Sequence, residues 1–196
     1  MSFTVCGLRV HLDFTFFAML GLFLCLNESP YLWWTLSALL LHEIGHLLSA
    51  LLTGIQMKEL SFSCFGICLM REERILNDWK RELFVYAGGP LINLFCFGFL
   101  SLLGLEVPCV IHLLLGCFQL LPIGALDGGC MMKLLLEHCC LPDMAEKLGT
   151  AVSCGALLPL FWFGIRLFCV EKRNFTLLLC CFFLLLTILS EGVKKS

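Results

Sequence analysis

Long apolar runs separated by short polar segments dominate the sequence. Each of the longer runs approaches the roughly 20 residues that an α-helix needs to cross the hydrocarbon core of a bilayer. The longer runs cover about residues 31–52, 83–105, 107–123, 148–170 and 175–190, and a shorter run covers 14–26. This pattern predicts an all-α membrane protein with about six transmembrane helices.

Two segments break the helical pattern. Residues 3–10 are β-branched and partly alternating, which is typical of a short strand, here at the membrane interface. Residues 57–70 are apolar but interrupted by Ser, Gly and Cys, which favours a short interfacial or re-entrant β segment. The charged residues 71–82 are predicted to be solvated, and residues 131–140 to form a short helix. Because we find no internal repeat or linker, we expect a single polytopic domain over residues 1–196.

Composition and charge agree with a membrane protein. Apolar residues make up 60% of the chain and charged residues 14%, and the net charge of −2 offers no basic surface for nucleic acid. The N-terminus lacks the basic start and uninterrupted apolar core of a cleavable signal. Most of the Lys and Arg residues fall in segments that would share one side with the N-terminus, so both termini are predicted to be cytoplasmic.

The fourteen cysteines suggest a disulfide scaffold or a metal cluster, but their placement favours neither. Most lie inside apolar runs, and the chain contains no CxxC pair; Cys64 and Cys68 come closest. We interpret the cysteines as small apolar residues of membrane helices.

The sequence HEIGH at residues 42–46 places three ionisable side chains inside an apolar run. A charged carboxyl in the middle of a membrane helix costs about 2.5–3.5 kcal/mol on insertion scales, so these residues need a compensating partner. Residues four apart lie on one helix face, about 6 Å apart along the axis, so His42 and His46 can bind one zinc ion. Glu43 follows the first ligand and can take a proton from a water molecule at that metal.

A catalytic zinc ion usually has a third protein ligand. Asp127 ends an apolar run and precedes two glycines that permit close backbone approach, so it is the favoured candidate. His112 and Glu106 remain as alternatives within the predicted spans.

Three motifs together resemble the site-2 protease family of intramembrane zinc metalloproteases. They are HEIGH at residues 42–46, AGGPLINL at 87–94 and FQLLPIGALDGG at 118–129, and the segment LRVHLDFTFF at 8–17 is similar to the family's opening. The resemblance covers nearly the whole chain. Its compact layout is closest to the stage IV sporulation protease subgroup, which releases a sporulation sigma factor from its membrane-bound precursor.

The resemblance implies that His42, His46 and Asp127 bind one zinc ion and that Glu43 activates the attacking water. It implies that the segment near 57–70 pairs with an unwound substrate strand. Gln119 stands where the family usually has an asparagine that helps to hold the substrate or the developing oxyanion. Ala125 replaces a common proline, and Asn93 matches a polar position of the family that could equally serve helix packing.

The expected function is therefore hydrolysis of a transmembrane or membrane-associated protein in a bacterial cell membrane, with a regulatory membrane protein as a further partner. The subgroup's nucleotide-sensing C-terminal domain is not expected here. Two other classes are open at this point. A metal transporter could use the same three ligands, and a catalytically silent scaffold could keep the fold.

Overall fold

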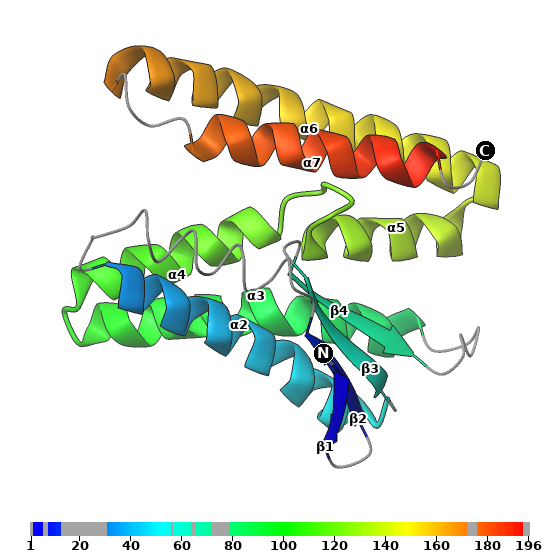
Figure 1. The fold of residues 1–196 in the computed structure, drawn as a ribbon, viewed down its shortest axis with the longest axis horizontal. Helices are drawn as coiled ribbons and strands as arrows, with labels where there is room; N and C mark the ends of the chain where they lie inside the picture. Colours follow the sequence, from blue (N-terminus) through cyan, green and yellow to red (C-terminus); the bar gives the residue numbers. More distant parts are fainter. Residues whose placement is uncertain are drawn as a thin grey trace. The chain divides into compact units, whose positions relative to one another are not determined.

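The computed structural model describes residues 2–5, 8–12, 31–55, 57–63, 66–71, 79–171 and 176–193 (Figure 1). The chain divides into two compact units, Met1–Cys117 and Phe118–Ser196. The predicted apolar run at 14–26 lies outside the described residues. One domain over the whole chain stays a prediction.

The first unit contains helices α2 (Leu32–Thr53) and α3 (Trp79–Leu102) and most of α4 (Glu106–Gln119). Both α2 and α3 are followed by a glycine in the left-handed conformation, Gly54 with φ 68° and Gly104 with φ 71°. The amide after each glycine bonds back to a carbonyl five residues earlier, from Ile55 to Ala50 at 3.2 Å and from Leu105 to Leu100 at 3.1 Å. Glycine therefore ends both helices, because other residues rarely adopt this conformation.

Helix α2 buries its small and polar residues and exposes its large apolar ones. The buried face includes Ala38, His42, Gly45, His46 and Ser49. Exposed positions are Trp33, Leu40, Leu51 and Leu52, each at least 63% accessible. This is the reverse of a helix in a soluble protein, and it suits a helix whose outer face meets lipid.

Small residues allow α2 and α3 to approach closely (Figure 1). A Cβ atom on Gly45 would collide with the Gly88 carbonyl oxygen and lie 3.0 Å from the Ile92 side chain. A Cβ atom on Gly88 would collide with the Ser49 hydroxyl. The backbones of the two helices therefore touch with no side chain between them, which fixes α3 against the buried face of α2.

A four-stranded sheet completes the first unit, with strands β1 (Ser2–Val5), β2 (Leu8–Leu12), β3 (Met57–Ser63) and β4 (Gly66–Arg71) in that order. Strand β2 pairs in parallel with β3, and the other two pairs are antiparallel. The predicted strand at 3–10 is two strands rather than one, because the chain reverses between Val5 and Leu8 to pair with itself. Strands β3 and β4 lie in the segment 57–70, and their interfacial or re-entrant placement stays a prediction.

The second unit contains α5 (Asp127–Cys139), α6 (Pro142–Glu171) and α7 (Thr176–Val193), and α6 and α7 run side by side (Figure 1). Its core is apolar and joins the turn before α5 to α6 and α7. The core residues are Ile123, Leu126, Leu157 and Leu184. This packing positions the turn from which α5 begins.

In the part of the chain that the structure describes, three helices are long and apolar enough to cross a membrane, namely Leu32–Thr53, Trp79–Leu102 and Pro142–Val170. Among the described residues, two shorter apolar helices accompany them, Glu106–Gln119 and Leu177–Ile188. The helices indicate an integral membrane protein, while the number of six transmembrane helices stays a prediction. Helices α3 and α6 begin four and six residues before the predicted spans, because their first turns are polar.

We predict that Gly45→Ala destabilises the first unit. The added methyl group would force α2 and α3 apart, and overpacking of this kind typically costs about 1–3 kcal/mol. Thermal unfolding in detergent measures the effect. Gly98→Ala is the matched control, because nothing lies within 4 Å of a Cβ atom at this α3 position. Equal stability of the two variants would contradict the close helix contact.

Candidate metal centre

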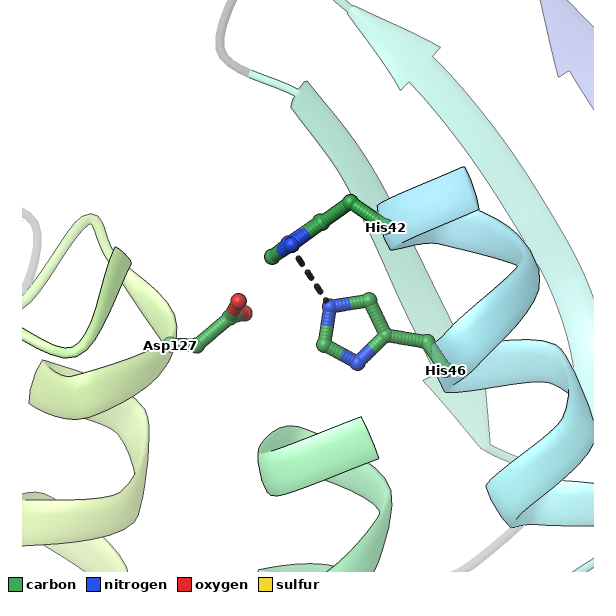
Figure 2. A group of neighbouring side chains, drawn as sticks. All are labelled: His42, His46 and Asp127. Carbon is green, nitrogen blue, oxygen red and sulfur yellow. Dashed lines mark hydrogen bonds between the residues drawn. The ribbon is translucent and has the colours of Figure 1, made fainter. Parts of the chain in front are cut away.

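Helix α2 brings His42 and His46 together on its buried face. The two rings are 1% and 6% exposed. Their centroids are 4.8 Å apart at an interplanar angle of 84°, and their Nε2 atoms approach to 3.2 Å (Figure 2). The helical spacing of the HEIGH motif therefore brings the Nε2 atoms of the two rings close together.

A backbone carbonyl of α3 orients the ring of His46. Its Nδ1 lies 2.8 Å from the carbonyl oxygen of Val85. Since a carbonyl oxygen only accepts hydrogen bonds, Nδ1 carries the hydrogen, and in the neutral ring Nε2 keeps its lone pair. Outer hydrogen bonds of this kind hold metal-binding histidines in place.

Asn93 of α3 approaches the outer nitrogen of His42. Its Nδ2 lies 3.1 Å from His42 Nδ1, and its Oδ1 lies 2.9 Å from Nδ1 of His112 on α4. All three side chains are buried. The structure thus places His112, an alternative third ligand in the sequence analysis, against Asn93. Sequence reasoning missed this link, although polar residues in three apolar helices were a signal for it.

The inner nitrogens of both rings face a position without a side chain. A Cβ atom on Gly89 would collide with His46 Nε2 and would lie 2.7 Å from His42 Nε2. The absence of a side chain at Gly89 therefore leaves the space in front of both Nε2 atoms free of a Cβ atom. This observation, together with two imidazole donors, fits a metal ion bound by His42 and His46.

Glu43 follows His42 on α2 and is half-buried. It stands about 100° around the helix from His42, as consecutive residues do. Its side chain therefore starts from the same turn of α2 as His42, on a neighbouring face of the helix.

In the second unit, Asp127 is the first residue of α5 and is half-buried (Figure 2). The preceding turn is held by backbone hydrogen bonds from Ile123 to Leu121 at 2.8 Å and from Leu126 to Ile123 at 2.7 Å. The Ser153 hydroxyl of α6 also accepts a hydrogen bond from the Gly124 amide at 3.2 Å. These bonds fix the backbone from which the carboxylate projects.

The two glycines after Asp127 have a packing role. Cβ atoms on Gly128 and Gly129 would collide with the carbonyl oxygens of Leu120 and Ile123. The start of α5 therefore lies directly against the preceding turn. Gln119 is the last residue of α4 and is half-buried. Because α5 begins at Asp127, the same turn connects Gln119 to Asp127.

Acidic residues also occur at helix starts for a simpler reason. Glu106 and Asp143 lie in the first turns of α4 and α6 and are exposed, where a negative charge favourably meets the helix dipole. Asp127 has the same position in α5 but is more buried. Because Asp127 is less exposed than Glu106, it is the better candidate for a metal ligand.

The ten cysteines in the described residues between 96 and 181 are free thiols. Cys109 donates to the Phe97 carbonyl at 3.5 Å, and Cys130 donates to the Gly124 carbonyl at 3.8 Å. Within the described residues, His42 and His46 of the first unit each offer a nitrogen atom to a metal ion, and Asp127 of the second unit offers an oxygen atom. This donor set suits zinc.

Comparisons with known proteins agree with this chemistry. Over 123 residues the chain is 31% identical to "Putative zinc metalloprotease sll0528" of Synechocystis sp.. The matched stretch covers 54% of this chain and 32% of that protein. The chain thus spans about a third of the length of this curated relative. No protein-family model matches.

A solved structure shows the same fold. The site-2 protease from Methanocaldococcus jannaschii matches with a TM-score of 0.69 at 21% identity, covering 97% of this chain and 95% of that chain. The sequence similarity therefore concerns a protein described as a putative zinc metalloprotease, and the structural similarity concerns the fold of a site-2 protease.

We predict that Gly89→Ala prevents zinc binding. The methyl group would occupy the space in front of both Nε2 atoms, so zinc content after purification, measured by mass spectrometry, should fall to background. Gly98→Ala, on the same helix with open space around it, should retain zinc. Normal zinc content in the Gly89 variant would show that metal does not bind at these nitrogens.

Proposed function

We propose that this protein is an intramembrane zinc endopeptidase of the site-2 protease type, which cuts membrane-bound protein substrates. The observation that carries the proposal is the pair of buried imidazoles on an apolar helix, with their Nε2 atoms facing Gly89. The similarity to a zinc metalloprotease and the site-2 protease fold support it.

In this proposal His42, His46 and Asp127 hold one zinc ion. When bound, the ion would lower the pKa of a water molecule and polarise the substrate carbonyl. The two histidines belong to the first unit and the aspartate to the second, so activity requires both units. The three ligands leave one position for water, as catalytic zinc sites do.

Glu43 acts as general base and then general acid. It takes the proton of the attacking water and passes it to the amine that leaves when the peptide bond breaks. Gln119 donates a hydrogen bond from its side-chain amide to the substrate or to the oxyanion that develops on the carbonyl. Its longer arm replaces the asparagine that is usual in the family.

The substrate would enter as an extended strand. Strand β4 lies at an edge of the sheet, with β3 as its neighbour, so an unwound substrate segment could pair with it by main-chain hydrogen bonds. Helical substrates must unwind before cleavage, because helix hydrogen bonds shield the peptide groups. The sheet would therefore position the substrate for the metal centre.

The finer assignments belong to the same proposal. The compact layout favours the stage IV sporulation protease subgroup and a sigma-factor precursor as substrate, under control of a regulatory membrane protein. The location would be the bacterial cell membrane, with both termini cytoplasmic. The metal transporter and the silent scaffold are the alternatives that the following experiments separate.

We predict that Glu43→Gln abolishes cleavage and leaves zinc bound. Loss of a general base typically lowers the rate by about 10²–10⁴-fold, while the metal ligands are unchanged. The membrane proteomes of cells that carry only the wild-type or only the variant protein are compared for single-span proteins that accumulate uncut. Undiminished proteolysis by the variant would contradict the mechanism, and zinc flux into proteoliposomes that survives the substitution would favour a transporter.

We predict that Asp127→Asn weakens zinc binding in a chelator competition assay, because an amide is a poor substitute for a carboxylate ligand. Asp143→Asn is the matched control, since it also removes an acid from the first turn of a helix. If Asp127 interacts only with the helix dipole, Asp127→Asn should lower the stability by about 0.3–1 kcal/mol and leave the zinc affinity unchanged. Equal zinc affinity of both variants would exclude Asp127 as a ligand.

A further inference from the structure

A continuous chain of buried hydrogen bonds connects three helices of the first unit. It runs from His112 on α4 to Asn93 on α3 at 2.9 Å, from Asn93 to His42 on α2 at 3.1 Å, and from His42 to His46 at 3.2 Å. Asn93 is completely buried and His112 is 3% exposed. Two polar side chains thus follow one another outward from Nδ1 of His42.

The direction of each hydrogen bond follows from its neighbours. His46 Nδ1 donates to the Val85 carbonyl, so its Nε2 can only accept in the neutral ring. His42 Nε2 is 3.2 Å from that acceptor and must therefore carry the hydrogen. The Nδ1 atom of His42 is then an acceptor, which agrees with the Nδ2 group of Asn93 beside it.

A metal ligand at His42 needs the opposite arrangement. Its Nε2 must offer a lone pair, so the hydrogen must lie on Nδ1 and be donated outward. A half-turn of the Asn93 amide exchanges its Oδ1 and Nδ2 atoms, which are nearly equal in size. Oδ1 then accepts from His42 Nδ1, whose hydrogen has moved there from Nε2. Nδ2 donates to the Nδ1 atom of His112, whose hydrogen moves to its own Nε2. No ring changes its charge and no helix has to move.

We propose that Asn93 and His112 are positioning residues that set which nitrogen of His42 carries its hydrogen, and thereby prepare that ring to bind the metal ion. The inference rests on the proposed zinc site. His112 suits the role because an imidazole Nδ1 can either donate or accept, so the amide keeps a partner in both orientations. Gly116, one turn along α4, supports the contact, since a Cβ atom there would lie 3.3 Å from the Asn93 Cβ atom.

The pair could instead serve only to hold helices together. The two roles differ in what they predict for zinc. An outer hydrogen-bond partner of a metal ligand typically contributes about 10–100-fold to metal affinity. A purely structural contact affects stability and leaves the affinity of the folded protein unchanged.

The first experiment measures zinc affinity by chelator competition on the purified full chain in detergent. Asn93→Leu should bind zinc about 10–100-fold more weakly. Asn93→Asp should stay close to wild type, because the introduced carboxylate accepts from His42 Nδ1. His112→Leu should weaken binding, and His112→Asn should restore much of it, since its amide can also donate or accept.

Cys109→Ala is the matched control, because Cys109 also joins α4 to α3, through the Phe97 carbonyl, one turn from His112. It should leave zinc affinity unchanged. Equal affinity of Asn93→Leu, His112→Leu and wild type would overturn the proposal. A loss in Asn93→Asp as large as in Asn93→Leu would overturn it too, and this variant decides the question if Asn93→Leu does not fold.

The second experiment locates the ring hydrogen of His42 from the ¹⁵N chemical shifts of the imidazole nitrogens. The protein is labelled with ¹⁵N-histidine, and its five histidines give few signals to assign. Without zinc the hydrogen of His42 should be on Nε2, and with zinc on Nδ1. In Asn93→Asp it should be on Nδ1 in both states. A hydrogen on Nδ1 in the zinc-free wild type would overturn the proposal.

These outcomes separate the inference from the proposed function. If wild type binds zinc but Glu43→Gln cleaves normally, the protease proposal fails and the affinity comparison still decides the inference. If Glu43→Gln is inactive while Asn93→Leu keeps full zinc affinity, the inference alone fails. A wild-type protein that binds no zinc would overturn both.

Discussion

Two imidazole rings can be buried together on an apolar helix only if each of their nitrogens is satisfied. Helix α3 meets this requirement in two ways. It provides the Val85 carbonyl and the Asn93 amide for the outer nitrogens of His46 and His42. At Gly89 it provides no side chain, so the two Nε2 atoms can bond to each other at 3.2 Å with no Cβ atom in their way. The orientation of both rings therefore depends on the fit between α2 and α3.

The close fit explains why small residues are concentrated at this interface. Gly45 and Gly88 let the two backbones touch, and this brings Val85 and Asn93 within hydrogen-bond distance of the rings. A wider separation would leave buried imidazole nitrogens without partners, which is costly in an apolar environment. Packing and chemistry are therefore coupled, because the same helix contact that stabilises the unit also orients the candidate ligands.

The second unit solves a different problem, which is to hold one carboxylate on a rigid backbone. The hydrogen-bonded turn before Asp127 and the direct contact of Gly128 and Gly129 with that turn leave the start of α5 little freedom. A charge at the first position of a helix is also favoured by the helix dipole. Asp127 is thus in a place where a negative charge is tolerated and its position is well defined.

Local periodicity and residue chemistry were enough to predict the apolar helices, the helical stacking of His42 and His46, and the candidate roles of Glu43 and Asp127. The sequence pattern placed the starts of α3 and α6 too late, since hydropathy marks the apolar part of a helix and not its polar first turn. The folded protein alone shows that Asn93 and His112 form one hydrogen-bonded chain with His42 and His46, and that Gly89 approaches both Nε2 atoms. Such contacts join residues 19 to 51 positions apart, and no local pattern specifies which side chains meet across helices.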